Sequence, residues 1–203
     1  METLNAYAAL FYDLYDSAQM VELGTQALQI ATALGLEYWV GRCYNVFASA
    51  YYLSRDFEQA LIYSQRALEL NEKHSDQLAQ IHTMNILTAI YANQGDYAES
   101  RRWGEACIQL GETLGAHHVL AANLGNWGFL TAQLGDLVAS EHYFLRGIEL
   151  SKRISRLLSA SNQLGAVAQV QIMLGKWDEA RASTRDWLHL ALEVDNLIGV
   201  LHG

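Results

Sequence analysis

The sequence predicts an all-α fold, an α-solenoid built from antiparallel pairs of helices. The first observation is an internal period of 40 residues: Gly95-Asp96-Tyr97 recurs as Gly135-Asp136-Leu137 and as Gly175-Lys176-Trp177. The second is the composition, because the 203 residues include no Pro and 51% of them are hydrophobic. A Pro-free chain with few β-branched runs favours helix throughout. A period of this size predicts a stack of similar units.

Two columns of the repeat indicate how the helices pack. One column is apolar in every copy, at Leu28, Leu68, Ile108, Ile148 and Leu188. Another column is small in every copy, at Ala8, Ala48, Thr88, Gly128 and Ala168. Small residues let two helices approach closely, and the large apolar residues fill the space between them. Each period therefore predicts one pair of packed helices.

The array begins with a degenerate pair, because Tyr15-Asp16-Ser17 lacks a Gly and Met20 occupies a position where a small residue is expected. After Asp195, residues 196–202 align with residues 156–162 one period earlier, so we expect a new helix to start there. An apolar helix without a partner predicts that the chain is a fragment of a longer protein. The sequence thus predicts about ten helices and the start of another. The predicted pairs span residues 3–34, 36–73, 75–114, 116–153 and 156–194, with the start of a sixth at 196–203.

The motif within each period resembles the tetratricopeptide repeat (TPR) family. The residues that carry the resemblance are Leu87-Thr88, then Tyr91, Gly95-Asp96-Tyr97, Ser100 and Cys107-Ile108. The usual TPR unit has about 34 residues, so the 40-residue period implies about three extra helical residues in each helix. The family implies a right-handed superhelix. Extended repeats of this kind are similar to those of bacterial signalling ATPases, transcriptional regulators and adaptors that orient the spindle.

Charge and composition bound the function classes. The formal net charge of −9 argues against a nucleic-acid partner, because phosphate binding needs a basic face. Cys43 and Cys107 are too few for a disulfide framework and predict buried thiols in a reducing compartment. No long uncharged apolar run and no basic leader segment occur, which predicts a soluble, cytoplasmic module without a membrane partner.

The sequence offers no catalytic, cofactor or metal motif. His117 and His118 are adjacent and point in different directions on a helix, and His74 and His82 lie eight residues apart without another ligand between them. There is no Gly-x-Ser-x-Gly and no phosphate-binding Gly-rich loop. We therefore predict a protein that is not an enzyme and has no cofactor or metal.

The TPR resemblance implies that the first helix of each pair lines a concave groove. Asparagine side chains on that face could grip an extended backbone, because an amide both donates and accepts hydrogen bonds. The alternative is that they are ordinary exposed polar residues. The residues expected on or beside the groove are Arg42, Asn45, Ser49, Tyr52, His82, Asn85, Asn93, Asn126, Phe129, Gln133, Asn162 and Gln169.

The predicted partner is a protein or peptide. Chaperone-binding TPR proteins clamp a terminal carboxylate with Lys and Asn, but Arg42 is the only cation at these positions, so an internal segment or a helix fits better. The function predicted first is therefore a non-catalytic protein-interaction scaffold. The alternatives are a regulatory or sensory module of a larger signalling protein, and a self-association module that joins copies through the terminal repeats.

Charge is unevenly distributed along the chain. Residues 1–41 carry five acidic residues and no Lys or Arg. Arg146, Lys152, Arg153 and Arg156 form a basic cluster. This cluster is either a solvated edge, a patch that seeks acidic groups, or a match to the acidic first repeat of another copy.

Overall fold

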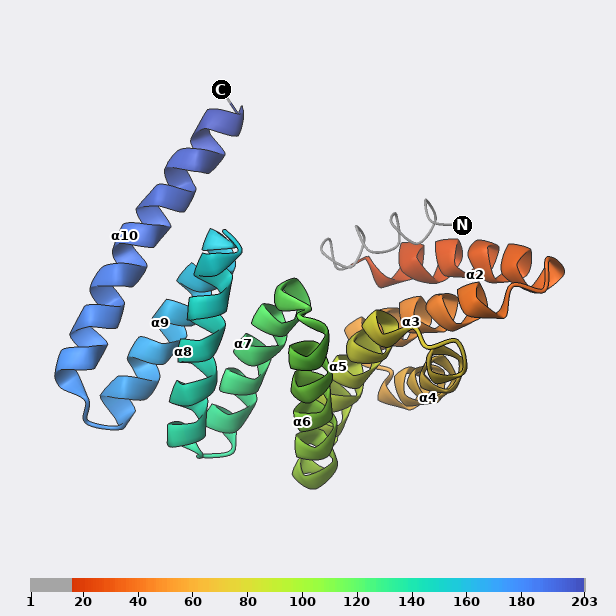
Figure 1. The fold of residues 1–203 in the computed structure, drawn as a ribbon, viewed down its shortest axis with the longest axis horizontal. Helices are drawn as coiled ribbons and strands as arrows, with labels where there is room; N and C mark the ends of the chain where they lie inside the picture. The colour runs from red at the N-terminus through yellow and green to blue at the C-terminus, as the bar shows by residue number, and fades with distance from the viewer. Residues whose placement is uncertain (1–15, 203) are drawn as a thin grey trace. The chain divides into compact units, whose positions relative to one another are not determined.

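The computed structural model describes residues 16–202, and side-chain surroundings up to residue 193. The described part of the chain is all-α, as the sequence predicted, with nine helices and no strand (Figure 1). The predicted first helix, residues 3–14, lies outside the described residues. The helices are α2 (Ser17–Ala33), α3 (Glu37–Leu53), α4 (Phe57–Lys73), α5 (Gln77–Gln94), α6 (Tyr97–Leu114), α7 (His117–Gln133), α8 (Leu137–Arg153), α9 (Leu157–Met173) and α10 (Trp177–His202).

The turns between these helices all use one geometry. Gly95 has a left-handed φ of 80°, and the next residue, Asp96, donates its N–H to the carbonyl oxygen of Tyr91 at 2.9 Å. This bond closes the end of α5. The side chain of Asp96 then accepts from the N–H of Glu99 at 3.2 Å and caps α6. The Gly-Asp pair is therefore explained by backbone geometry. Left-handed residues recur every 20 residues, at Gly35, Arg55, Ser75, Gly95, Gly115, Gly135, Ser155 and Gly175.

The end of the array differs from the sequence-based expectation. A new helix was expected from residue 196, but α10 runs without a break from Trp177 to His202 and has 26 residues. The preceding described helices have 17 or 18 residues. Residue 195, which is 20 residues after Gly175, is an Asp within the helix. Continuing the helix keeps its backbone groups hydrogen-bonded, whereas a turn there would need other partners for them.

The chain divides into two compact units, unit 1 (residues 1–110) and unit 2 (residues 111–203). In the described part of unit 1, α3 packs against α2, α4 and α5. Cys43 and Cys107 are buried in this unit, as predicted. Burial raises the pKa of Cys43 to about 11 and that of Cys107 to about 12, so both stay protonated.

In unit 2, α8 packs against α7 and α9, and α9 packs against α10 (Figure 1). Phe144, Ile148, Leu164, Val167 and Leu190 form its core. The small column explains one close approach in this core. A Cβ atom at Gly128 would lie 2.6 Å from the ring of Phe144, so the buried ring packs directly against the α7 backbone. At Gly128, a small residue in this column thus allows α7 and α8 to approach closely.

Candidate functional site

The first helices of the pairs form one surface in each unit, which we call the first-helix face. In unit 1 it consists of α3 and α5, which contact each other, and in unit 2 of α7 and α9, which also contact each other. The twelve residues expected to contact a partner all come from these four helices. The two faces differ in their side chains and are described separately.

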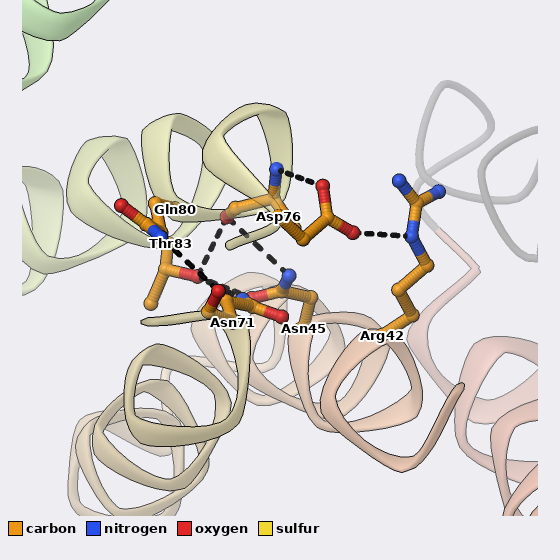
Figure 2. A network of polar contacts seen from close by, with 7 residues as sticks. Arg42, Asn45, Asn71, Asp76, Gln80 and Thr83 are labelled. Atoms are coloured by element: carbon orange, nitrogen blue, oxygen red, sulfur yellow. Dashed lines mark hydrogen bonds and ion pairs between the residues drawn. The ribbon is translucent and has the colours of Figure 1, made fainter. Parts of the chain in front are cut away.

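An ion pair joins α3 to the start of α5 in unit 1 (Figure 2). Arg42 Nε donates to Asp76 Oδ2 at 2.8 Å, and the side chain of Asp76 is 7% exposed. Asp76 Oδ1 also accepts from the N–H of Ala79 at 3.2 Å and so caps α5. Burial by itself would raise the pKa of Asp76, but the hydrogen bonds from Arg42 and Ala79 outweigh it and lower the pKa.

A second set of hydrogen bonds fills the space beside this ion pair (Figure 2). Thr83 Oγ1 donates to Asn45 Oδ1 at 2.5 Å and accepts from Asn71 Nδ2 at 3.2 Å. Asn45 Nδ2 reaches the carbonyl oxygen of Ala79 at 3.5 Å. Gln80 Nε2 donates to the carbonyl oxygen of Asn71 at 3.1 Å. These bonds connect α3, α4 and α5 and leave Asn45 only 6% exposed.

The expectation that Asn45 and Ser49 present open polar groups on the face is therefore corrected. Ser49 is 2% exposed, and its Oγ donates to the carbonyl oxygen of Asn45 at 3.0 Å. The same Oγ lies 3.1 Å from His82 Nε2. Because the hydroxyl has one hydrogen, His82 is the donor in that second bond. Both residues are used within the protein, since α5 packs directly over them.

The other expected residues of unit 1 keep some exposure. His82 and Asn93 are exposed, and Arg42, Tyr52 and Asn85 are half-buried. Asn93 Nδ2 donates to the carbonyl oxygen of Ala89 at 2.8 Å and approaches the Tyr52 hydroxyl at 3.5 Å. Tyr52 also packs against Phe57. Unit 1 thus presents a polar face whose side chains are mostly engaged with one another.

Unit 2 has an open pocket of about 540 Å³ on its first-helix face. Three expected residues line it: Asn126 and Phe129 from α7, and Asn162 from α9. Phe129 is 50% exposed, although the edge of its ring contacts Phe144 at a centroid distance of 4.9 Å. Gln133 and Gln169 are exposed on the same helices but do not line the pocket. The structure therefore brings three of the twelve residues together in one cavity.

Sequence reasoning missed the residues that the start of α9 contributes. Arg156 and Leu158 line the pocket, and Leu158 is 59% exposed. The TPR columns point to positions inside the first helices and not to the turn before α9, so they could not indicate Arg156 as a site residue. The only feature of the sequence that singled out Arg156 was its place in the basic cluster. Of the described residues that line the pocket, Arg156 is the one that carries a charge. Its Nη1 donates to the carbonyl oxygen of His118 at 3.2 Å.

Gln163 forms the inner wall of the pocket. Its side chain is 3% exposed, and its Nε2 lies 3.3 Å from the carbonyl oxygen of Ala121 and 3.1 Å from Ser159 Oγ. A Cβ atom at Gly125 would lie 3.0 Å from Gln163 Cδ, and one at Gly147 would lie 2.0 Å from Gln163 Oε1. The two glycines therefore make room for this buried amide.

The basic cluster is partly neutralised within unit 2. Arg146 forms an ion pair with Glu112, and Lys152 lies 3.8 Å from Asp186. Arg146, Arg153 and His117 line a second pocket of about 240 Å³, together with the acidic side chains of Glu112 and Glu149. This second pocket carries both signs of charge, whereas Arg156 gives the first pocket one sign only.

The described residues contain neither a metal-binding cluster nor a membrane-spanning helix. No group of three or more His, Cys, Asp or Glu side chains that could hold a metal ion occurs among them. None of the helices described is long and apolar enough to cross a membrane.

The fold and its repeated turns define a helical-repeat protein, and comparison with known proteins identifies the repeat. The family model described as "Tetratricopeptide repeat" matches residues 40–76 and 81–120. These two segments therefore match the tetratricopeptide repeat that the sequence predicted. No curated protein matches it.

Several solved structures share the fold at low sequence identity. Aspartyl phosphate phosphatase F from Bacillus subtilis has 13% identity and a TM-score of 0.81, over 95% of this chain and 50% of that one. A Rap protein complexed with competence and sporulation factor has 15% identity and a TM-score of 0.81, over 94% of this chain and 53% of that one. A signal transduction ATPase from Pyrococcus horikoshii with a tetratricopeptide repeat sensor has 15% identity and a TM-score of 0.70.

The chain spans about half the length of the first two proteins. The match to the Pyrococcus protein covers 97% of this chain and 32% of that protein. At these identities, the likeness shows a shared fold of stacked helix pairs.

Proposed function

We propose that this chain is a non-catalytic protein-interaction module, and that the first-helix face of unit 2 binds a segment of another protein. The observation that carries the proposal is the open pocket between α7 and α9, which combines exposed apolar and amide side chains. Ligand sites are typically concave, with an apolar lining and a few polar groups that fix orientation.

The residues in the pocket suit a peptide. Phe129 offers a half-exposed aromatic surface for an apolar side chain of the partner. Asn126 and Asn162 carry amides, which can pair with both the N–H and the C=O of an extended backbone. Gln133 and Gln169 extend the polar surface along the same two helices. Tyr52, His82, Asn85 and Asn93, with Arg42, are candidates for a separate contact on unit 1, where Asn45 and Ser49 contribute to folding.

A regulatory role within a larger protein is the second candidate. The Pyrococcus protein of similar fold is named for a tetratricopeptide repeat sensor, and the Rap protein was solved in complex with competence and sporulation factor. In both comparisons, this chain matches only part of the longer protein. In this role, a segment bound in the pocket would shift the equilibrium between two states of the parent protein.

Self-association is the third candidate and has its own observation. Trp177, Leu188 and Leu192 on α10 are 64%, 53% and 65% exposed. Exposed apolar side chains on one helix favour contact with another protein surface or a second copy. Sedimentation of the purified chain over a range of concentrations tests this candidate, which predicts a mass that rises with concentration.

Affinity capture from a lysate of the source organism tests the principal proposal. Three baits are used: the native chain, a pocket variant with Phe129→Ser and Asn162→Ser, and a control variant with Val138→Ser. Val138 is 68% exposed on α8 and does not line the pocket. We expect a protein that is retained by the native chain and the control and lost by the pocket variant, with unchanged helix content by circular dichroism. A partner retained equally by all three baits contradicts the proposed site.

A further inference from the structure

The unit 2 pocket occupies the place that the Arg42–Asp76 ion pair fills in unit 1. Residues 42 and 122 are two periods apart in the sequence, and so are residues 76 and 156. In unit 1 these positions hold Arg42 and Asp76, which are ion-paired at 2.8 Å. In unit 2 they hold Ala122 and Arg156, and both line the pocket. An arginine thus stands at the position that Asp76 holds in unit 1, and no carboxylate among the described residues is paired with it.

The guanidinium of Arg156 retains hydrogen-bonding capacity. Nη1 donates to the carbonyl oxygen of His118 at 3.2 Å, while Nε and Nη2 have no partner among the described residues. Lys152 and Arg153, both exposed, precede it in the same turn region and add positive charge. Asp186 offsets part of the Lys152 charge at 3.8 Å. A guanidinium with free N–H groups beside a neutral pocket favours a carboxylate, which can accept two of them.

The rest of the pocket offers an apolar surface beside that charge. Phe129 and Leu158 are 50% and 59% exposed, and Ala122 is exposed between the helices. At the position equivalent to Phe129, unit 1 has the buried Ser49, so the exposed aromatic ring is specific to unit 2, whereas Leu158 has an exposed counterpart in Leu78. An aromatic and an aliphatic side chain in one concave surface suit an apolar residue of a ligand.

We propose that the pocket between α7 and α9 binds a partner segment that carries an Asp or Glu next to an apolar residue. The carboxylate pairs with Arg156, and the apolar side chain packs on Phe129 and Leu158. In unit 1 the carboxylate that pairs with the arginine is Asp76 of the same chain, whereas in unit 2 the partner provides the carboxylate. This inference rests on the proposed function, because it names the chemistry of the segment that the module binds.

Binding of defined peptides tests the proposal. Fluorescein-labelled peptides of about eight residues on a Gly/Ser background are made as four pools. The first pool carries Asp and Leu within a few residues of each other, the second Asn and Leu, the third Lys and Leu, and the fourth Asp and Ser. Fluorescence anisotropy measures the affinity of each pool for the native chain, Arg156→Gln, Arg156→Glu, Phe129→Ser and the control Arg185→Gln. Arg185 is exposed on α10 and does not line the pocket.

We expect the Asp/Leu pool to bind the native chain about tenfold more tightly than the Asn/Leu or Lys/Leu pools. In those pools, the carboxylate that pairs with Arg156 is replaced by a neutral amide or by a positive charge. Arg156→Gln should remove this preference, and Arg156→Glu should invert it in favour of the Lys/Leu pool. Arg185→Gln should keep the native pattern. The preference should weaken as salt is raised. Circular dichroism checks that each variant is folded.

The outcomes separate this inference from the proposed function. If all Leu-containing pools bind equally and Phe129→Ser abolishes binding, the pocket is a peptide site and the acidic specificity is overturned. If the Asp/Leu preference persists in Arg156→Gln, Arg156 is not the group that selects the acid. If no pool binds, the inference is overturned, and the capture experiment with Phe129→Ser and Asn162→Ser decides the proposed function separately.

Discussion

The junction of α3, α4 and α5 in unit 1 and the junction of α7, α8 and α9 in unit 2 occupy the same places in the repeat but differ in their interiors. In unit 1, Asn45 reaches from α3 toward Thr83 on α5, and Arg42 pairs with Asp76. In unit 2, the equivalent of Asn45 is Gly125, and Gln163 reaches in from α9. The comparison shows that the repeat fixes where a site lies, while a few side chains decide whether that site is filled or open.

Whether the surface between the two first helices is filled depends on the helix that carries the buried amide side chain, which is α3 for Asn45 and α9 for Gln163. A side chain on α3 that points toward α5 fills the surface between the two first helices. A side chain on α9 that turns inward to Ser159, Ser151 and the α7 backbone leaves that surface empty. Both arrangements hydrogen-bond the nitrogen of a buried amide, while Gln163 Oε1 has no partner among the described residues. Only the second leaves a pocket of about 540 Å³.

The largest effect in this comparison is expected for Gly128→Ala. Its new Cβ atom would lie 2.6 Å from the ring of Phe144, which is 1% exposed and has no room to move. We expect a loss of about 2–3 kcal/mol in the free energy of unfolding, the upper part of the range for overpacked cores. Urea unfolding followed by circular dichroism measures it. In a Phe144→Leu background the same substitution should cost less; an equal cost in both backgrounds would refute the steric explanation.

Asn45→Ala should have the next largest effect. It removes two buried hydrogen bonds, from Thr83 Oγ1 to Asn45 Oδ1 and from Asn45 Nδ2 to the Ala79 carbonyl oxygen, although Thr83 Oγ1 can still donate to that carbonyl oxygen at 2.8 Å. We expect a loss of about 1–2 kcal/mol in the free energy of unfolding. The matched control is Asn162→Ala, because Asn162 lies on the equivalent face of α9 but is exposed, and its loss should stay within about 0.5 kcal/mol. Equal losses would contradict the distinction between the filled and open junctions.

Placing the unit 1 ion pair in unit 2 should fill the junction that is open in the native chain. The double variant Ala122→Arg with Arg156→Asp recreates the Arg42–Asp76 arrangement and gives α9 an Asp at its start, where it now has no side-chain cap. We expect a gain of about 1 kcal/mol in the free energy of unfolding, mostly from the cap. The same variant should lose binding of the Asp/Leu peptide pool. Retained binding would show that the pocket stays open despite the pair.

The smallest effect is a dependence of stability on pH that belongs to unit 1 alone. The pKa of Asp76 is lower in the folded protein than its ordinary value of 3.8. The stabilisation from its ionised form is therefore complete above pH 3.8 and is lost as the pH falls through the lower, folded pKa. Because Arg42 is partly exposed, we expect a contribution below about 1 kcal/mol.

Asp76→Asn isolates this contribution, since Asn can still cap α5. Its free energy of unfolding, measured by urea titration from pH 6 downwards, should fall less steeply in the acid range than that of the native chain. Identical slopes would show that the ion pair does not stabilise the folded state.

Several features were predictable from the sequence for simple reasons. The pairs of helices followed from columns such as Gly128 and Leu68, because a repeated pattern averages out local irregularity. Glycine and aspartate at Gly95 and Asp96 predicted a turn, and the structure adds that Ser75 and Ser155 adopt the same left-handed conformation without a glycine. The burial of Cys107 followed from its place in a column of small residues between the helices, and Cys43 is buried as well.

Other features required the tertiary structure. Asn45 and Asn162 look alike on a helical projection, and only the packing of α5 over α3 shows that Asn45 is buried. Arg156 lies in a turn that no helical column describes, so its place in the pocket could not be predicted. The uninterrupted α10 replaced an expected turn near residue 195, because alignment to an earlier repeat does not specify whether a helix packs there.

The sequence by itself determined the period, the order of helices and turns, and which columns are small or apolar, because these depend on local backbone geometry and on hydrophobic pattern. The tertiary structure decided which polar side chains are consumed inside the protein and which remain available. That outcome depends on which side chains meet between helices that are 30 to 40 residues apart in the sequence. Arg42 pairs with Asp76, and their side chains fill the junction of unit 1. Arg156 pairs with no carboxylate among the described residues, and the junction of unit 2 stays open.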